Sequence, residues 1–439
     1  MFQAPTLWGL LPLLVFIILV FREWKPVAAI TTALIVAAIM GGQSFIDVAS
    51  AVKSGMGSFI AYVGLIILAG AGLGKVTEAT GVAPRIVNFV MHKIGVDTPT
   101  KAMIGTMAVS ALLVSLLGTL AGANAIIAPV VIPIVATAGL SSSVVAVIFQ
   151  GAGATGLFLG PFTPPMVTLM KYTGLSYPQI LIAAGIPVSI ILLLTTFFYC
   201  KKILPKSIEN HPYTKEDIAA LSNNKFEDMT DKEKKNSKRA TYGFLITLLG
   251  LISYGLIIEG GSTFAIFVIL TTAIVTGLAG GLHPNEIADK IAEGAQPLVW
   301  IFFMFVLFSP FIQFVEDMGA FTALKNLLMP LIDSGGKGLL MILSSLIGIA
   351  GIPGAAVAQV VVIHEMFISI VNDMGLSMVN WVLVLLVGSQ VTFFLYPTGD
   401  TLGAMGIARS DDLKNMIIFG VVATIPIVIY IIIKALFFV

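Results

Sequence analysis

The chain has 439 residues, of which 57% are hydrophobic and 11% charged, and its formal net charge is +1. Its mean hydropathy of +1.01 is too high for a soluble protein of this length, because no globular core needs that much apolar surface. The small net charge argues against a nucleic-acid partner, and the single cysteine, Cys200, excludes an intrachain disulfide. Since the alternation of a membrane barrel is absent, the composition predicts an all-α integral membrane protein.

The N-terminal apolar run has no basic residue before it and is followed by Arg22 and Lys25, unlike a cleaved signal peptide. We therefore expect a first span that stays in the protein, with the N-terminus outside. Spans at 7–21 and 26–41 are joined by the short link FREWK, so they should be antiparallel neighbours. An amphipathic stretch, SFIDVASAVKSG, then precedes a third span at 57–74 and is predicted to lie along the membrane interface.

Two short apolar arms follow an interfacial segment at 75–101. The arms, at 102–118 and 124–138, meet at the small and polar sequence GTLAGANAI. Short arms with such a connection predict a re-entrant hairpin that enters and leaves the membrane on one side.

The next apolar segment, 142–170, is interrupted by the stretch Gly153–Leu169, GATGLFLGPFTPPMVTL. Gly160 and three prolines deny it a continuous ladder of helical hydrogen bonds, so the helix should break there. Irregular backbone at membrane depth survives only where protein or a water-filled cavity satisfies its polar groups. A second such break, LYPTGDTLG, lies at 395–403, and we expect the two breaks to build one site for a transported solute.

A span at 179–200 closes the first half, 1–200, and residues 201–240 form the only long hydrophilic stretch. We predict a cytoplasmic linker there, in part without regular structure. The second half, 241–439, repeats the pattern of spans, hairpin and broken helix. Its expected spans lie at 242–258, 264–280, 297–315 and 416–438, and its hairpin arms meet at GIAGIPGAAV.

Matching segments indicate an internal duplication. DVASAVKSG after one Gly-Gly pair corresponds to EIADKIAEG after another, and Pro161 falls opposite Pro397 when the two Gly-Leu-Ser sequences are aligned. About ten transmembrane helices result, five crossings plus one hairpin in each half. An odd number of crossings forces the halves into opposite orientations, so the repeat is predicted to be inverted. Most Lys and Arg residues then fall on one face, which the positive-inside rule makes cytoplasmic.

In each half the hairpin tip and the break should converge near the midplane, presenting helix N-termini, free carbonyls and small hydroxyls. N-termini attract anions, and carbonyls with Asn or Thr oxygens suit sodium. The predicted substrate-binding residues are Gly122, Asn124, Thr155, Thr163, Pro164, Gly354, Thr398, Gly399 and Thr401. The predicted coupling-ion residues, with sodium as the candidate metal, are Asn124, Gly160, Pro353, Asp400, Glu365 and His364. The alternative is that the Gly and Pro residues only allow close helix packing.

Ionisable groups in the apolar zone are few, and each costs about 2.5 to 3.5 kcal/mol at a helix centre. We expect Asp400 to hold the coupling ion or to contact substrate, and Glu365 with His364 to carry a proton. The alternative is that these groups are locally paired and hold the second hairpin in place. Four further polar residues are either site residues or packing contacts between helices: Asn124, Gln150, Ser389 and Gln390.

The sequence resembles the ion transporter superfamily, which contains the divalent anion:sodium symporters and the large membrane subunits of tripartite dicarboxylate transporters. GATGLFLGPFTPPM is similar to the family's glycine-rich stretch ending in Thr-Pro-Pro-Asn, and LYPTGDTLG occupies the equivalent place in the second half. The resemblance implies sodium- or proton-coupled carriage of a small carboxylate by an elevator movement against a dimeric scaffold. The chain differs at its hairpin tips, GANA and GIPGA, where the symporters carry Ser-Asn-Thr, at Met166 in place of asparagine, and at Asp400.

We therefore expect a secondary transporter in a bacterial-type inner membrane, a homodimer that carries a small organic carboxylate or amino acid with sodium or protons and needs no cofactor. The main alternative is a sodium/proton antiporter that uses Asp400 and Glu365. A third is a channel-like or scaffolding subunit that depends on a partner. Neither a phosphate-binding GKS or GKT motif nor a nucleophilic triad is evident, which disfavours an ATP-driven pump or an enzyme.

Overall fold

The computed structural model describes residues 5–221, 229–351, 356–396 and 399–439, and all regular structure in these ranges is helical. Twelve helical segments within them are long and apolar enough to cross a membrane. Large apolar side chains are exposed on the outer faces of the helices, for example Ile39, Ile246 and Ile425, which are 67%, 70% and 52% exposed. Outward-facing apolar side chains suit contact with lipid. The prediction of an all-α integral membrane protein is confirmed.

The helices of the first half follow the predicted order of spans, hairpin arms and broken helix. They are α1 (Leu11–Phe21), α2 (Pro26–Gly41), α3 (Phe45–Gly55), α4 (Phe59–Ala79), α5 (Val82–Ile94), α6 (Pro99–Leu117), α7 (Leu120–Thr137), α8 (Ser142–Leu159), α9 (Pro164–Thr173), α10 (Tyr177–Ile180), α11 (Ile186–Asn210) and, in the linker, α12 (Lys215–Leu221). Short turns η1 (Leu7–Leu10) and η2 (Leu181–Gly185) lead into α1 and α11.

The second half has the same succession of long and short helices. It contains α13 (Asp231–Ile257), η3 (Ser262–Phe264), α14 (Ala265–Ala279), α15 (Pro284–Ala295), η4 (Gln296–Leu298), α16 (Val299–Asp317), α17 (Ala320–Ile349), α18 (Ala356–Asp373), α19 (Met378–Gln390), α20 (Thr392–Leu395), α21 (Gly399–Ala408) and α22 (Leu413–Phe437). Within α17 the backbone leaves helical geometry at Gly336, whose φ of 66° suits glycine. This kink separates the expected interfacial segment from the first arm of the second hairpin.

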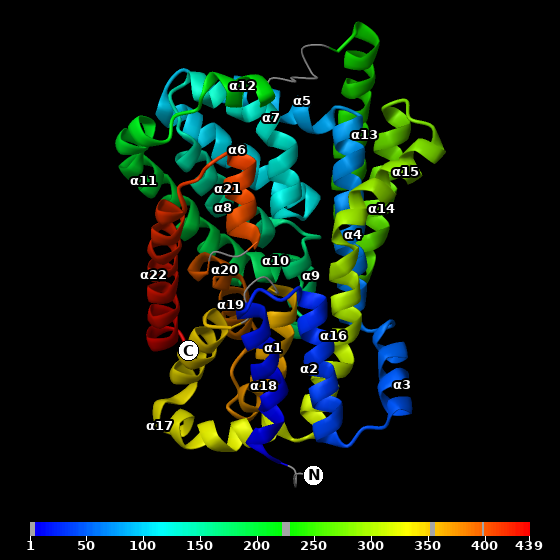
Figure 1. The fold of residues 1–439 in the computed structure, drawn as a ribbon, viewed down its shortest axis with the longest axis vertical. Coiled ribbons are helices and arrows are strands. Elements are labelled where there is room, and N and C mark those ends of the chain that lie inside the picture. Colours follow the sequence, from blue (N-terminus) through cyan, green and yellow to red (C-terminus); the bar gives the residue numbers. More distant parts are fainter. Residues whose placement is uncertain (1–4, 222–228, 352–355, 397–398) are drawn as a thin grey trace.

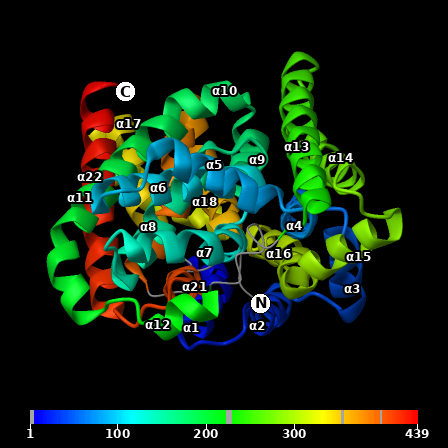
Figure 2. The same cartoon turned by 90° about the horizontal axis from the view of Figure 1, so that it is seen from above.

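Two groups of helices make up the molecule, and each draws on both halves of the chain. The first packing group consists of α1–α4 with α13–α16, and the second consists of α5–α11 with α17–α22. Figures 1 and 2 show α13, α14 and α15 on one side of the molecule and α6, α8, α11 and α22 on the other. The division of the chain at the linker thus does not correspond to two separate bodies, and the duplication stays a prediction.

The linker is more helical than we expected. α11 continues to Asn210, and α13 begins at Asp231, well before the apolar part of that helix. Thr230 caps α13 by accepting a hydrogen bond from the Glu233 amide, and the Glu233 carboxylate accepts one from the Thr230 amide at 2.7 Å. Such a capping box, followed by lysine-rich sequence, favours helix without help from packing. Residues 222–228 lie outside the described ranges.

Candidate functional site

The first break lies between α8 and α9. Gly160 ends α8 in an extended conformation (φ −74°, ψ 133°), and α9 begins at Pro164, where a missing N–H costs nothing. Thr163 Oγ1 lies 2.6 Å from the Leu157 carbonyl oxygen and 3.0 Å from that of Gly160, so its hydroxyl satisfies the carbonyl end of α8. The prolines therefore interrupt the helix, and Thr163 satisfies the carbonyl groups that the interruption leaves without partners.

The first hairpin turns between α6 and α7. Gly118 ends α6 at a φ of 73°, and α7 begins at Leu120. Asn124 lies inside α7 and is fully buried, not at the turn. Its Oδ1 accepts from Ser110 Oγ at 2.7 Å, and its Nδ2 donates to the Phe149 carbonyl at 3.0 Å. This amide ties both hairpin arms to α8.

The second break separates α20 from α21. α20 ends at Leu395, Tyr396 is extended (φ −120°, ψ 137°), and α21 begins at Gly399. Asp400 lies in the first turn of α21, and its carboxylate has no hydrogen-bond or ion-pair partner among the described residues. Of the predicted site residues, Thr398 lies outside the described ranges, as do Pro353 and Gly354 at the second hairpin.

A cavity of about 800 Å³ lies between these elements and the first packing group. Its volume is within the range of about 300 to 1,000 Å³ that small-molecule sites occupy. One side is formed by the first hairpin, both breaks and the start of α18, and the other by α4, α15, η4 and α16. The lining residues from the first side include Thr119, Gly122, Pro164, Pro165, Ala356, Gln390, Phe393 and Asp400.

The N-terminal turns of four helices contribute to this cavity. These are residues 120–122 of α7, 164–165 of α9, 356–357 of α18 and Asp400 of α21. Each helix N-terminus carries a partial positive charge from the aligned peptide dipoles. On this side, the cavity therefore combines several weakly positive helix ends with the Asp400 carboxylate.

Three charged side chains on the opposite wall were not among the predicted site residues. Lys75 of α4 lies 3.0 Å from a carboxylate oxygen of Glu78 and 3.2 Å from one of Glu293 on α15, and all three line the cavity. The ion pair between α4 and α15 joins the two halves of the chain. Lys75 and Glu78 directly follow an apolar span in the sequence, which could have pointed to them as site residues. They were instead expected in the interfacial segment at 75–101.

The predicted site residues divide into two sets. Gly122, Pro164 and Asp400 line the cavity. Those not among its lining residues are Asn124, Thr155, Gly160, Thr163, His364, Glu365, Gly399 and Thr401. Thr401 is nevertheless adjacent to Asp400 and accepts a hydrogen bond from Gln150 Nε2 at 3.3 Å.

His364 and Glu365 lie on α18 and are not among the residues that line the cavity. His364 is buried, and its Nδ1 accepts from Trp381 Nε1 at 3.3 Å. The imidazole also packs against the ring of Tyr172 on α9, with centroids 5.0 Å apart. This histidine joins three helices, while the half-buried Glu365 makes no hydrogen bond to it.

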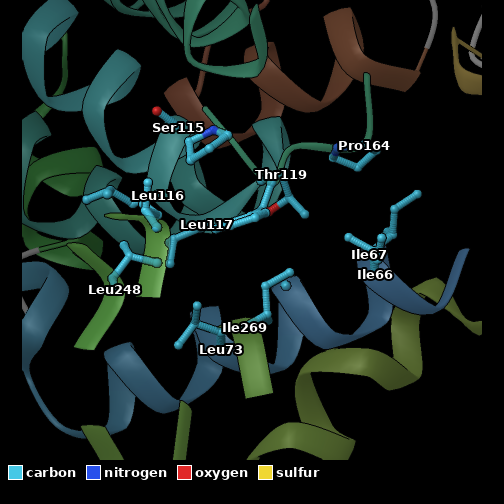
Figure 3. Close-up of a pocket in the computed structure, with 15 residues that line it drawn as sticks. Ile66, Ile67, Leu73, Ser115, Leu116, Leu117, Thr119, Pro164, Leu248 and Ile269 are labelled. Carbon is cyan, nitrogen blue, oxygen red and sulfur yellow. The ribbon is translucent and has the colours of Figure 1, made fainter. Parts of the chain in front are cut away.

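A small apolar void of about 20 Å³ lies where the first hairpin meets the first packing group. Figure 3 shows Leu116, Leu117, Thr119 and Pro164 facing side chains of α4, α13 and α14. The facing residues are Ile66, Ile67 and Leu73 of α4, Leu248 of α13 and Ile269 of α14. We call this contact between the first hairpin and α4, α13 and α14 the apolar seam. Its side chains carry no polar atoms except the hydroxyls of Ser115 and Thr119.

A helical membrane fold with a cavity between a hairpin and two broken helices is typical of secondary transporters. The chain belongs to the citrate transporter family (CitMHS), whose model matches residues 14–292, more than half of the chain. It is therefore a multi-pass membrane carrier, and the resemblance to the ion transporter superfamily is confirmed.

Among solved structures, the chain is similar to MtrF of Neisseria gonorrhoeae, a protein described as illuminating a class of antimetabolite efflux pumps. The match covers 93% of this chain and 95% of MtrF, with a TM-score of 0.60 and 14% sequence identity. At this identity the similarity shows the fold alone. No curated protein matches the chain.

Proposed function

We propose that this protein is a secondary active transporter that carries a small organic carboxylate together with a cation, sodium or proton. The observation that carries the proposal is the meeting, in a single cavity, of four helix N-termini and the Asp400 carboxylate, which has no hydrogen-bond or ion-pair partner among the described residues. Helix N-termini bind anions, and a carboxylate in an apolar cavity attracts a cation. The description of the family as citrate transporters supports a carboxylate as the solute.

The proposed mechanism is an elevator movement of the second packing group against the first. The apolar seam between the first hairpin and α4, α13 and α14 supports it, because it contains no ion pair that sliding would break. The Lys75–Glu293 pair lies within the first packing group, so it would remain in place. We further propose that the first packing group forms the dimer contact.

We propose that the two halves are inverted repeats and that the linker is cytoplasmic in a bacterial-type inner membrane. The amphipathic helices α3 and α15 hold equivalent places in the two halves. Figure 1 shows them at opposite ends of the long axis of the molecule, α15 towards the end that carries α12 and the start of α13. Helices related by an inverted repeat should lie at opposite membrane faces.

A sodium/proton antiporter is the second candidate function. Asp400 favours it, because a carboxylate that lines a cavity and has no partner within the described ranges can exchange a proton for a sodium ion. In that case the cavity would hold ions and water, and no organic solute would move.

Uptake into proteoliposomes separates the candidates. Purified protein is reconstituted, and a panel of labelled carboxylates and amino acids is offered under a sodium gradient alone or a pH gradient alone. We expect one gradient to drive accumulation of a carboxylate. Sodium-driven proton flux with no movement of any organic solute would instead establish the antiporter.

A further inference from the structure

The first turns of α13 carry a dense run of basic side chains. Five of the nine residues at 231–239 are Lys or Arg, and the two acids among them are Asp231 and Glu233. Residues 240–257 then contain no charged side chain and extend about 27 Å at 1.5 Å per residue, close to the hydrocarbon thickness of about 30 Å. The basic run therefore ends where the polar headgroups of a membrane begin.

Three of these basic residues share one face of α13 with side chains suited to lipid. With 3.6 residues per turn, positions 235, 238, 239, 242, 246 and 249 fall within about 100° of one another around the helix. Figures 1 and 2 show α13 at the edge of the molecule. All six side chains are exposed, and we call them the outer face of α13: Lys235, Lys238, Arg239, Tyr242, Ile246 and Leu249.

Contacts on the opposite side of α13 fix the direction of this outer face. Ser237 is 1% exposed, and its Oγ donates to the Gly81 carbonyl at 2.9 Å. Phe244 and Leu248 follow on the same side and are also buried. The helix cannot rotate about its axis without losing the Ser237 bond and exposing both apolar side chains. The basic residues of the outer face are therefore held pointing away from the protein.

The protein does not neutralise the basic end of the outer face. None of its three basic residues has an ion-pair partner among the described residues. Glu233 lies on the other side of the helix, and its carboxylate accepts from the amide and the hydroxyl of Thr230. Asp231 does share the outer face, but it lies one turn before Lys235, farther from the apolar end. Three positive charges and one negative charge leave a net +2.

We infer that the outer face of α13 binds an anionic phospholipid, with the headgroup phosphate against its three basic residues and the acyl chains along its three apolar and aromatic residues. Clustered Lys and Arg directly beside a membrane span attract anionic headgroups, and tyrosine favours the headgroup level. A soluble phosphate would use the basic end alone, whereas a lipid also covers the exposed apolar end. The inference goes beyond the proposed function, because it concerns the outside of the first packing group and not the cavity.

Lipid preference is measurable at the apolar end of the outer face. Ile246→Cys in a Cys200→Ser background is labelled with a bimane and reconstituted into mixed vesicles of phosphatidylcholine and phosphatidylglycerol. Quenching by a trace of nitroxide-labelled phosphatidylglycerol is compared with quenching by the same amount of nitroxide-labelled phosphatidylcholine. We expect phosphatidylglycerol to be enriched at this position by about fivefold or more. The enrichment should fall as salt is added, because salt screens the headgroup charge.

Three variants separate charge on the outer face from a general preference of the protein. Lys235→Gln, Lys238→Gln and Arg239→Gln made together should remove the enrichment. The matched variant with Lys235→Arg, Lys238→Arg and Arg239→Lys keeps every charge and should keep the enrichment. A bimane at Ile425→Cys on α22, an outward position that is 52% exposed, should show no preference between the two lipids.

Four results would overturn the lipid site. They are equal quenching by both lipids at Ile246→Cys, the same enrichment at Ile425→Cys, enrichment that survives in the glutamine variant, and enrichment that soluble glycerol phosphate abolishes. The last result would assign the basic residues to a soluble phosphate compound. Since no transported solute enters the assay, its outcome is independent of whether the protein carries a carboxylate.

Discussion

Substitution of Gly156 tests how closely the first hairpin must lie against the broken helix. A Cβ atom at Gly156 would lie 2.5 Å from the carbonyl oxygen of Ala111, 2.7 Å from Val114 Cβ and 2.8 Å from the Ser115 amide nitrogen. Two of these atoms belong to the backbone of α6, so a rotamer change cannot relieve the clash. We expect Gly156→Ala to destabilise the protein by about 1 to 3 kcal/mol, the usual cost of overpacking.

The matched control is Gly403→Ala in α21. A Cβ there meets nothing within 4 Å, so the change should stabilise the helix by about 0.5 to 1 kcal/mol through the lost flexibility of glycine. Thermal unfolding of both variants in detergent gives the comparison. If Gly156→Ala unfolds at or above the temperature of Gly403→Ala, the close contact of α6 with α8 described above is wrong.

Three further predictions concern the ends of the helices and the topology. Burial acts to raise the pKa of Asp412, but hydrogen bonds from Asn415 and Ser143 and the nearby His211 outweigh it and lower the pKa below its usual 3.8. Its contribution to stability is therefore complete above about pH 3.8 and is lost as the pH falls through the lowered value. The stability of wild type relative to Asp412→Asn, measured by thermal unfolding from pH 7 down to pH 3, should shrink only at the acid end; a difference that is constant with pH would contradict this. Cys200, which is fully buried, should resist a maleimide in the folded protein and react in SDS, as mass spectrometry would show. A Lys232→Cys substitution in a Cys200→Ser background places a thiol at an exposed position near the start of α13. In right-side-out vesicles it should be shielded from impermeant reagents, and labelling there would reverse the proposed orientation.

The order of helices was largely predictable, because long apolar runs indicate membrane helices, and glycine and proline indicate where a helix breaks. The break before Pro164 follows from the inability of proline to continue a hydrogen-bonded ladder. The arms of the first hairpin were expected to be short, but α6 and α7 have 19 and 18 residues and are long enough to cross a membrane, so the re-entrant geometry stays a prediction. The helical linker was missed because its charged composition resembles that of irregular segments, while the capping box at Thr230 acts locally.

The residues that line the cavity were predictable only where the local sequence marks a hairpin tip or a helix break. Gly122, Pro164 and Asp400, which were predicted from the hairpin tip and the breaks, line the cavity, and their binding roles stay predictions. Asn124 was expected in the site, yet its bonds to Ser110 and Phe149 depend on how α6 and α8 pack, which no spacing in the sequence reveals. The partners of Gln150 and Gln390 were equally hidden, since a glutamine in an apolar helix is compatible with packing or with binding until its partners are known.

Transport by Asp400→Asn most directly tests the central claim that a cation held at the second break drives the solute. Asparagine keeps the size of the side chain and removes the charge, so the variant should reach the membrane folded and monodisperse. In proteoliposomes with an inward gradient of sodium or of protons, we predict that wild type accumulates a labelled carboxylate under one of the two gradients and that the variant does so under neither. Accumulation at the wild-type rate by Asp400→Asn would contradict the account.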